Sequence, residues 1–330
     1  MTNPNKYEIY AKRLIYLGIF TLVISSLLFL FKTTKLDLRN NINTDVFGHF
    51  GAFIGGLLGA FFSLAGIYLL ILNLRSQENY TKKQQIESRF FELLKIHREN
   101  TKELTIQEKS GKEIFKWLQK ELFICFQVIY EFKERKSIEL QIDEIINIAY
   151  ISFYYGAVGK YSSRIVFNLL QYLKKDDFIK DLLDEFETRK EELSNGFPYK
   201  VFDGHQIRLG HYFRHLFQTV KYINNQPANI LSFEEKYQYI KTLRAQFTNQ
   251  EQVVFFFNSL SSLGKKWEKD DKCDTNNQLI TKYNLIKNIP MEYISFTSPR
   301  NFYPNVEYEN DFNYTKEKME MMKIYRQQQI

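Results

Sequence analysis

The sequence is poor in cysteine, in strand-like alternation and in known catalytic motifs. Two cysteines among 330 residues, Cys125 and Cys273, exclude a disulfide framework and favour reducing, cytosolic surroundings. No HExxH, GxSxG, zinc-ribbon or GxxxxGK[ST] motif occurs. The GAVGK stretch that ends at Lys160 lacks the spacing of a phosphate-binding loop. The missing motifs exclude the enzyme classes that those motifs identify. The scarcity of strand-like alternation predicts a mainly α protein.

Charge is missing altogether from residues 46–74, VFGHFGAFIGGLLGAFFSLAGIYLLILNL. As a helix this stretch would rise about 43 Å, more than the bilayer's hydrocarbon core of about 30 Å. Residues 14–31 form a second uncharged stretch, and the lysines that follow it do not resemble a signal-peptide cleavage site. We therefore expect an N-terminal two-helix transmembrane hairpin followed by an all-α cytosolic helical domain.

The expected organisation follows from these two stretches. It comprises a cytosolic tail (1–13), a first span (14–31), a connector (32–45), a second span (46–74) and a helical cytosolic domain (75–330). Positive residues flank the first span almost equally, but four more follow the second span: Arg75, Lys82, Lys83 and Arg89. The positive-inside rule then predicts two spans in a bacterial inner membrane with both termini in the cytoplasm.

Small residues recur every four positions along the second span. One stripe is Gly51, Gly55, Gly59 and Ser63, and the other is Gly48, Ala52, Gly56 and Ala60. Such spacing allows a second helix to approach closely inside lipid. The simpler interpretation is packing against the first span of the same chain; the alternative is a homo-oligomer, including a pore built from several copies.

After the second span, helical periodicity continues without proline or glycine to Thr105, with His97 on its apolar face. An apolar stripe predicts another helix from residue 112 onward. Further helices are predicted over residues 142–153, 176–193, 206–224, 233–246, 250–263, 278–288 and 315–328. Loops are predicted over residues 197–205, 270–276 and 295–313. The net charge of +7 and the pI near 9.0 permit contact with nucleic acid or anionic lipid without requiring it.

Residues 206–224, QIRLGHYFRHLFQTVKYIN, hold the best candidate for chemistry. At about 100° per residue, one arc is apolar, whereas the opposite arc carries polar side chains. These polar side chains are Arg208, His211, His215, Gln218 and Tyr222, with Arg214 at the edge. We treat Arg208, His211 and His215 as candidate catalytic residues, supported by His97, Asn100, Arg214, Gln218 and Tyr222.

Three interpretations of this polar face stay open. Arg208 and His215, with six residues between them, resemble the signature of HEPN-type ribonucleases. That resemblance implies metal-independent RNA cleavage, with histidine moving a proton and arginine stabilising phosphate charge. Leu209 departs from the polar residue common in those enzymes. Alternatively, His211 and His215 bind a metal with His205, or the face is structural. We expect no metal and no cofactor.

The chain also resembles the phage abortive infection proteins of the AbiC-like group, whose pattern is two N-terminal spans and a helical cytosolic domain. The resemblance rests on RFFELLKIHREN (89–100), GHYFRHLFQTVKYI (210–223), YIKTLRAQFTNQEQVVFFFN (239–258) and residues 279–290, and covers about residues 85–305. It implies a role in antiphage defence and leaves the biochemical activity open. The expected partners are the lipid bilayer, a second copy of the chain, RNA, and a phage-derived trigger or a co-encoded defence protein.

Overall fold

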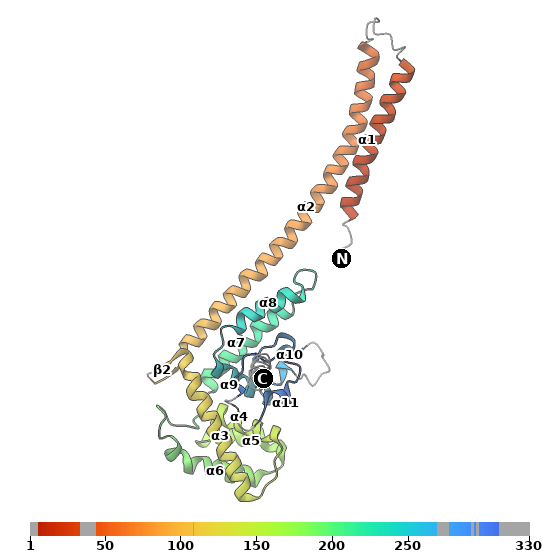
Figure 1. Ribbon diagram of the computed structural model, residues 1–330. Helices are drawn as coiled ribbons and strands as arrows, with labels where there is room; N and C mark the ends of the chain where they lie inside the picture. Colours follow the sequence, from red (N-terminus) through yellow and green to blue (C-terminus); the bar gives the residue numbers. More distant parts are fainter. Residues whose placement is uncertain are drawn as a thin grey trace, which may run out of the picture. The chain divides into compact units, whose positions relative to one another are not determined.

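The computed structural model describes residues 6–33, 44–107, 109–268, 277–291, 294 and 297–309. The described chain is mainly helical, as predicted (Figure 1). It divides into two compact units, Met1–Ile86 and Glu87–Ile330, and α2 (Thr44–Glu103) contributes to both. The loop at 270–276 and the helix at 315–328, both predicted from the sequence, lie outside the described residues.

The first unit contains α1 (Lys6–Thr33) and the first part of α2, two helices that run beside each other (Figure 1). The rings of Phe29 and Phe50 stack with their centroids 4.0 Å apart, and a Cβ at Gly18 would lie 3.4 Å from Phe61. Among the described residues of this unit, the buried apolar side chains are Ala11, Ala65 and Ile86. Both helices are long and apolar enough to cross a membrane, and 6% of each apolar window is buried.

The small-residue stripes of α2 do not contact α1. A Cβ built at Gly51, Gly55 or Gly59 meets no atom within 4 Å, and the same holds for Gly48 and Gly56. All eight stripe residues are exposed. The five stripe glycines therefore have no neighbour in α1 among the described residues. Larger side chains of α2 fill the contact with α1, because rings such as Phe50 reach across the gap and bury more apolar area.

The second unit begins with residues 87–103 of α2 and a hairpin of two short strands, β1 (Thr105–Ile106) and β2 (Lys109–Ser110). The sequence analysis did not predict this hairpin, since two residues per strand give no alternating pattern. The unit continues with η1 (Gly111–Glu113), α3 (Ile114–Lys136), α4 (Ile142–Tyr155), α5 (Lys160–Leu170), η2 (Gln171–Leu173) and α6 (Asp176–Leu193). It ends with α7 (Gln206–Asn224), α8 (Phe233–Arg244), α9 (Asn249–Leu260), η3 (Lys265–Trp267), α10 (Leu279–Tyr283) and α11 (Pro299–Phe302).

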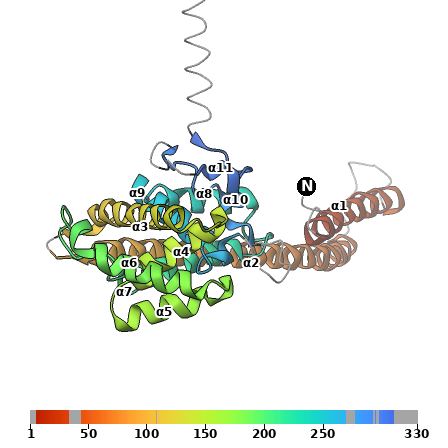
Figure 2. The ribbon, with the colours of Figure 1, turned by 90° about the horizontal axis from the view of Figure 1, so that it is seen from below.

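The core of this unit forms around α3, which packs against α4, α6 and α9 (Figure 2), while α7 packs against α8 (Figure 1). Aromatic side chains fill it, among them Phe126 and Phe257, whose ring centroids lie 5.0 Å apart. Capping boxes begin α8 at Ser232 and α9 at Thr248, each with a glutamate at the third helical position. These local signals explain why both helices start close to the predicted residues.

Several predicted boundaries are confirmed and others need correction. The predicted helices at 176–193 and 206–224 coincide with α6 and α7. The helix predicted over 278–288 is wrong in length, because Asn284 adopts a left-handed conformation that ends α10. The predicted loop at 295–313 contains the short helix α11, which begins at a proline. The sequence analysis assigned no helix to α5, which follows the positive-φ residue Gly159.

Candidate functional site

The start of α7 is fixed by a close backbone crossing with the end of α4. Gly156 and Gly204 both have positive φ, at 94° and 88°. A Cβ on Gly204 would lie 2.5 Å from the Tyr155 carbonyl, so only glycine fits. The His205 amide donates to the Tyr154 carbonyl at 2.8 Å. This crossing places His205 immediately before the first turn of α7. It also gives a structural reason for Gly156, the first glycine of GAVGK, which does not belong to a phosphate-binding loop.

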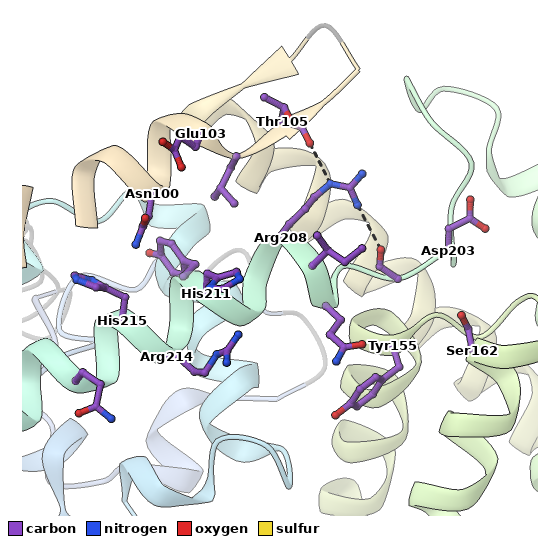
Figure 3. Close-up of a pocket in the computed structure, with 16 residues that line it drawn as sticks. Asn100, Glu103, Thr105, Tyr155, Ser162, Asp203, Arg208, His211, Arg214 and His215 are labelled. Atoms are coloured by element: carbon purple, nitrogen blue, oxygen red, sulfur yellow. Dashed lines mark hydrogen bonds between the residues drawn. The ribbon is translucent and has the colours of Figure 1, made fainter. Parts of the chain in front are cut away.

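A cavity of about 1030 Å³ opens along the polar face of α7 (Figure 3). Its walls come from α2, β1, α4, α5, the 203–204 loop and α7. Of the residues predicted for the site, those that line it are Asn100, Arg208, His211, Arg214, His215 and Gln218. His97 and Tyr222 do not line it. The predicted polar arc is therefore largely one surface of one cavity.

Arg208 is held against the backbone at the cavity wall. Its Nε donates to the Thr105 carbonyl at 3.0 Å, and its Nη1 donates to the Gly204 carbonyl at 3.4 Å (Figure 3). Nη1 also lies 3.4 Å from Nδ1 of His205. These contacts engage Nε and Nη1 and fix the plane of the guanidinium. A fixed guanidinium lining a cavity is suited to binding an oxyanion such as a phosphate.

Behind Arg208 lies a buried pair that the sequence analysis did not identify. Glu121 on α3 is fully buried, and its Oε2 lies 2.8 Å from Nε2 of His205. Its Oε1 accepts from the Phe202 amide at 2.8 Å. Burial alone would raise the pKa of Glu121, but His205 and this amide hold the pKa below its ordinary value. Glu121 lies on the apolar face of α3, three residues after Leu118 and four before Cys125, and a carboxylate at such a position is the signal that could have revealed the pair.

His215 lies on the polar face of α7, but its ring is less accessible to solvent than that position predicts. Both of its ring nitrogens are shielded from solvent and have no hydrogen-bond partner among the described residues. Burial, together with the charge of Arg89, lowers its pKa. His97 stacks on it, with ring centroids 6.2 Å apart and ring planes at 15°. In this arrangement neither nitrogen of His215 faces open solvent.

His97 is buried and packs against α7 through ring contacts. Its ring also contacts Tyr212 and Phe247, with centroids 5.1 and 5.9 Å away. Burial and the neighbouring His215 and Lys112 lower its pKa to about 4. Tyr212, which the sequence analysis did not place in the core, is buried and donates to Glu251 Oε1 at 3.2 Å.

Of the predicted site residues that line the cavity, His211, Arg214 and Gln218 are exposed. Arg214 donates through Nε to the Gly210 carbonyl at 2.9 Å, one turn earlier. His211 is therefore the histidine of α7 that is open to a ligand in the cavity. Of the three candidate catalytic residues, His211 has an exposed side chain and Arg208 is held by backbone carbonyls.

The alternative metal site does not assemble. Nε2 of His205 bonds to Glu121 and its Nδ1 faces Arg208, so this ring is not available to join His211 and His215. Across the described ranges, no group of three or more His, Cys, Asp or Glu side chains is arranged to hold a metal ion.

Comparison with known proteins gives one match. Residues 204–294 match the family model described as "putative phage abortive infection protein". This range contains three of the four sequence blocks on which the resemblance rests, and the block at 89–100 lies outside it. No curated protein and no solved structure matches the chain. The segment that carries α7 and its polar face is thus similar to the phage abortive infection proteins.

Proposed function

We propose that this protein is a membrane-anchored antiphage effector that arrests or kills the infected cell before phage release. The observation that carries the proposal is the pairing, in one chain, of two exposed apolar helices with a segment similar to abortive infection proteins. An apolar helix pair with so little burial is costly in water and favourable in lipid. A bilayer would cover the surface that the first unit leaves open.

In this proposal, residues 14–31 and 46–74 cross the bacterial inner membrane as a hairpin, and both termini lie in the cytoplasm. The basic residues Arg75, Lys82, Lys83 and Arg89 follow the second span, as the positive-inside rule expects of a cytoplasmic flank. The free thiol of Cys125 is buried in the second unit and agrees with a reducing compartment.

The lethal act that fits this arrangement is a change in the membrane made by several copies of the hairpin. The small-residue stripes support it, because Gly51, Gly55 and Gly59 have open space where a second helix could approach. A homo-oligomer packed through this face would bring backbones together inside lipid. A signal from the cytosolic unit, given by a phage-derived trigger or a co-encoded protein, would start assembly.

A second candidate is a membrane-tethered HEPN-like ribonuclease, supported by the cavity along α7. Arg208 is fixed where it could hold a phosphate, and His211 is open to the cavity as a proton-transfer group. His215, the histidine at the HEPN-type spacing, would need its ring nitrogens uncovered before it could act. A third candidate is an infection sensor or adaptor without toxicity of its own.

The experiment that separates these functions follows RNA integrity and survival in infected cells. Cells carry the wild type, Arg208→Ala with His215→Ala, Arg208→Ala with His211→Ala, or Gly55→Leu with Gly59→Leu. Arg164→Ala, an exposed arginine on α5 away from the cavity, is the matched control. The membrane effector predicts that RNA stays intact during the arrest, and that only the glycine variant loses protection and releases phage. RNA breakdown that needs Arg208 would favour the ribonuclease, and protection without arrest would favour the sensor.

A further inference from the structure

A second cavity, of about 710 Å³, lies on the helical unit away from the polar face of α7. Its walls come from α8, the first turn of α9 and the segment after α10. The polar residues that line it are Tyr237, Lys241, Arg244, Asn249, Gln252, Lys287, Asn288 and Glu309. Its volume falls within the range of small-molecule sites, roughly 300–1,000 Å³.

Arg244 brings a buried charge to this cavity. The residue is 7% exposed, and its Nη1 donates to the carbonyls of Tyr283 and Asn284 at 3.3 and 2.8 Å. Within the described part of the chain it forms no ion pair with a carboxylate. Backbone carbonyls satisfy hydrogen bonds without neutralising the charge. A buried cation without a counter-ion is costly, so an anion in the cavity would be bound favourably.

Of the charged side chains that line this cavity, three are cations and one is a carboxylate, and one of the cations is also paired with a carboxylate outside the lining. Lys241 lies one turn earlier on α8, and Lys287 lies on the opposite wall, 3.7 Å from Glu307. The single carboxylate in the lining is Glu309, which accepts from the side-chain amide of Asn288. Three cations therefore face one carboxylate across the cavity, which favours a ligand with negative charge.

The remaining wall suits the uncharged part of a ligand. Tyr237 and Phe247 supply ring surface, and Gln252 is 2% exposed with no partner for its Oε1 in the described chain. Burial alone would raise the pKa of Tyr237, but its hydrogen bond from Asn284 and the charge of Arg244 hold the pKa below its ordinary value. This lowering is the electrostatic effect expected beside a group of cations.

We propose that this second cavity is a binding site for a phosphorylated small molecule of nucleotide size. The phosphate groups would lie between Lys241, Arg244 and Lys287, where each N–H to oxyanion contact is charge-assisted. The ring of a base would lie against Tyr237 and Phe247, and a base or ribose donor would satisfy Gln252. The site is separate from the cavity along α7, and the inference does not depend on the membrane-anchored role.

The test is calorimetric titration of the full chain in detergent micelles with two charge-matched probes, ATP and inorganic triphosphate. The variant is Lys241→Gln with Lys287→Gln, two side chains whose removal leaves the buried Arg244 and its carbonyl partners in place. Lys116→Gln, at an exposed lysine on α3 that lines neither cavity, is the control for removing a surface lysine outside the site. Thermal unfolding of each variant, followed without ligand, confirms that the fold is retained.

The proposal predicts that both probes bind, that ATP binds more tightly, and that the double variant weakens both about tenfold or more while Lys116→Gln does not. Binding should also weaken as salt rises. Absence of binding by both probes would overturn the proposal, as would binding that the double variant leaves unchanged. Equal affinity for ATP and triphosphate would overturn the nucleotide part and retain a phosphate site.

Discussion

Glu121 and His205 form a buried pair, with Oε2 of one 2.8 Å from Nε2 of the other, directly behind the arginine of the candidate site. When His205 donates its Nε2 proton to Glu121, Nδ1 of the same histidine can accept a hydrogen bond from Nη1 of Arg208, 3.4 Å away. The pair thereby links α3 to the first turn of α7. Its position predicts a role in stability and in the orientation of Arg208.

Replacing Glu121 with alanine should destabilise the helical unit by about 3 kcal/mol, because the change leaves His205 and the Phe202 amide buried without their acceptor. In chemical denaturation, the loss of stability lowers the denaturant concentration at the midpoint of unfolding. Glu134→Ala, which removes an exposed partner of Lys133, should cost less than about 1 kcal/mol. Equal effects from the two substitutions would contradict a structural role for the pair.

Acidification should destabilise the protein through His97. Its pKa of about 4 in the folded chain lies below the ordinary value of 6.5, so between these values the unfolded chain binds more protons. The neutral His97 ring contributes its full share of the free energy of unfolding above pH 6.5, and this contribution is lost as the pH falls. The loss should be about 2 kcal/mol between pH 7 and pH 5. Glu121 does not add to this slope, because the stability it provides is lost only below its ordinary pKa of 4.5.

His97→Phe keeps an aromatic ring, removes the titration and leaves no unpartnered Nδ1. Its denaturation midpoint should therefore fall less than that of the wild type between pH 7 and pH 5. A wild-type slope in His97→Phe would show that His97 does not titrate in this range.

Leucine at Gly55 and Gly59 should abolish killing while leaving the protein in the membrane. The added side chains would meet open space within one chain, so the fold of the hairpin should persist, but close approach of a second helix would be blocked. Phe53→Leu changes an exposed residue of the same helix outside both stripes and is the matched control. Plaque counts and phage yield after infection measure the effect, and continued protection by the glycine variant would exclude assembly through this face.

The sequence predicted the helices well where one periodic signal was sufficient. The bounds of α6 and α7 and the apolar face that includes His97 follow from residues within one helix. The candidate site was predicted in part, because its polar face lies on α7 alone, whereas the pair behind it joins residues 84 positions apart. Spacing within a helix cannot reveal that Glu121 meets His205, or that His215 is covered by His97.

The small-residue stripes of α2 also show that spacing within one helix does not identify its partners. Four-residue spacing predicts a face that a helix can approach, but it does not say which helix approaches it. The structure places α1 against Phe50 and Phe61 and leaves the glycines open. Similarly, Arg244 and Lys287 come together from segments that no local pattern connects.

The most direct test of the membrane-anchored defence role counts plaques on cells producing the full chain and on cells with an empty vector, and fractionates the same cells by alkaline extraction. The account predicts fewer plaques, early death or arrest of infected cells, and protein that stays in the membrane pellet because both apolar helices are embedded. Equal plaque counts, or protein released into the soluble fraction, would contradict it.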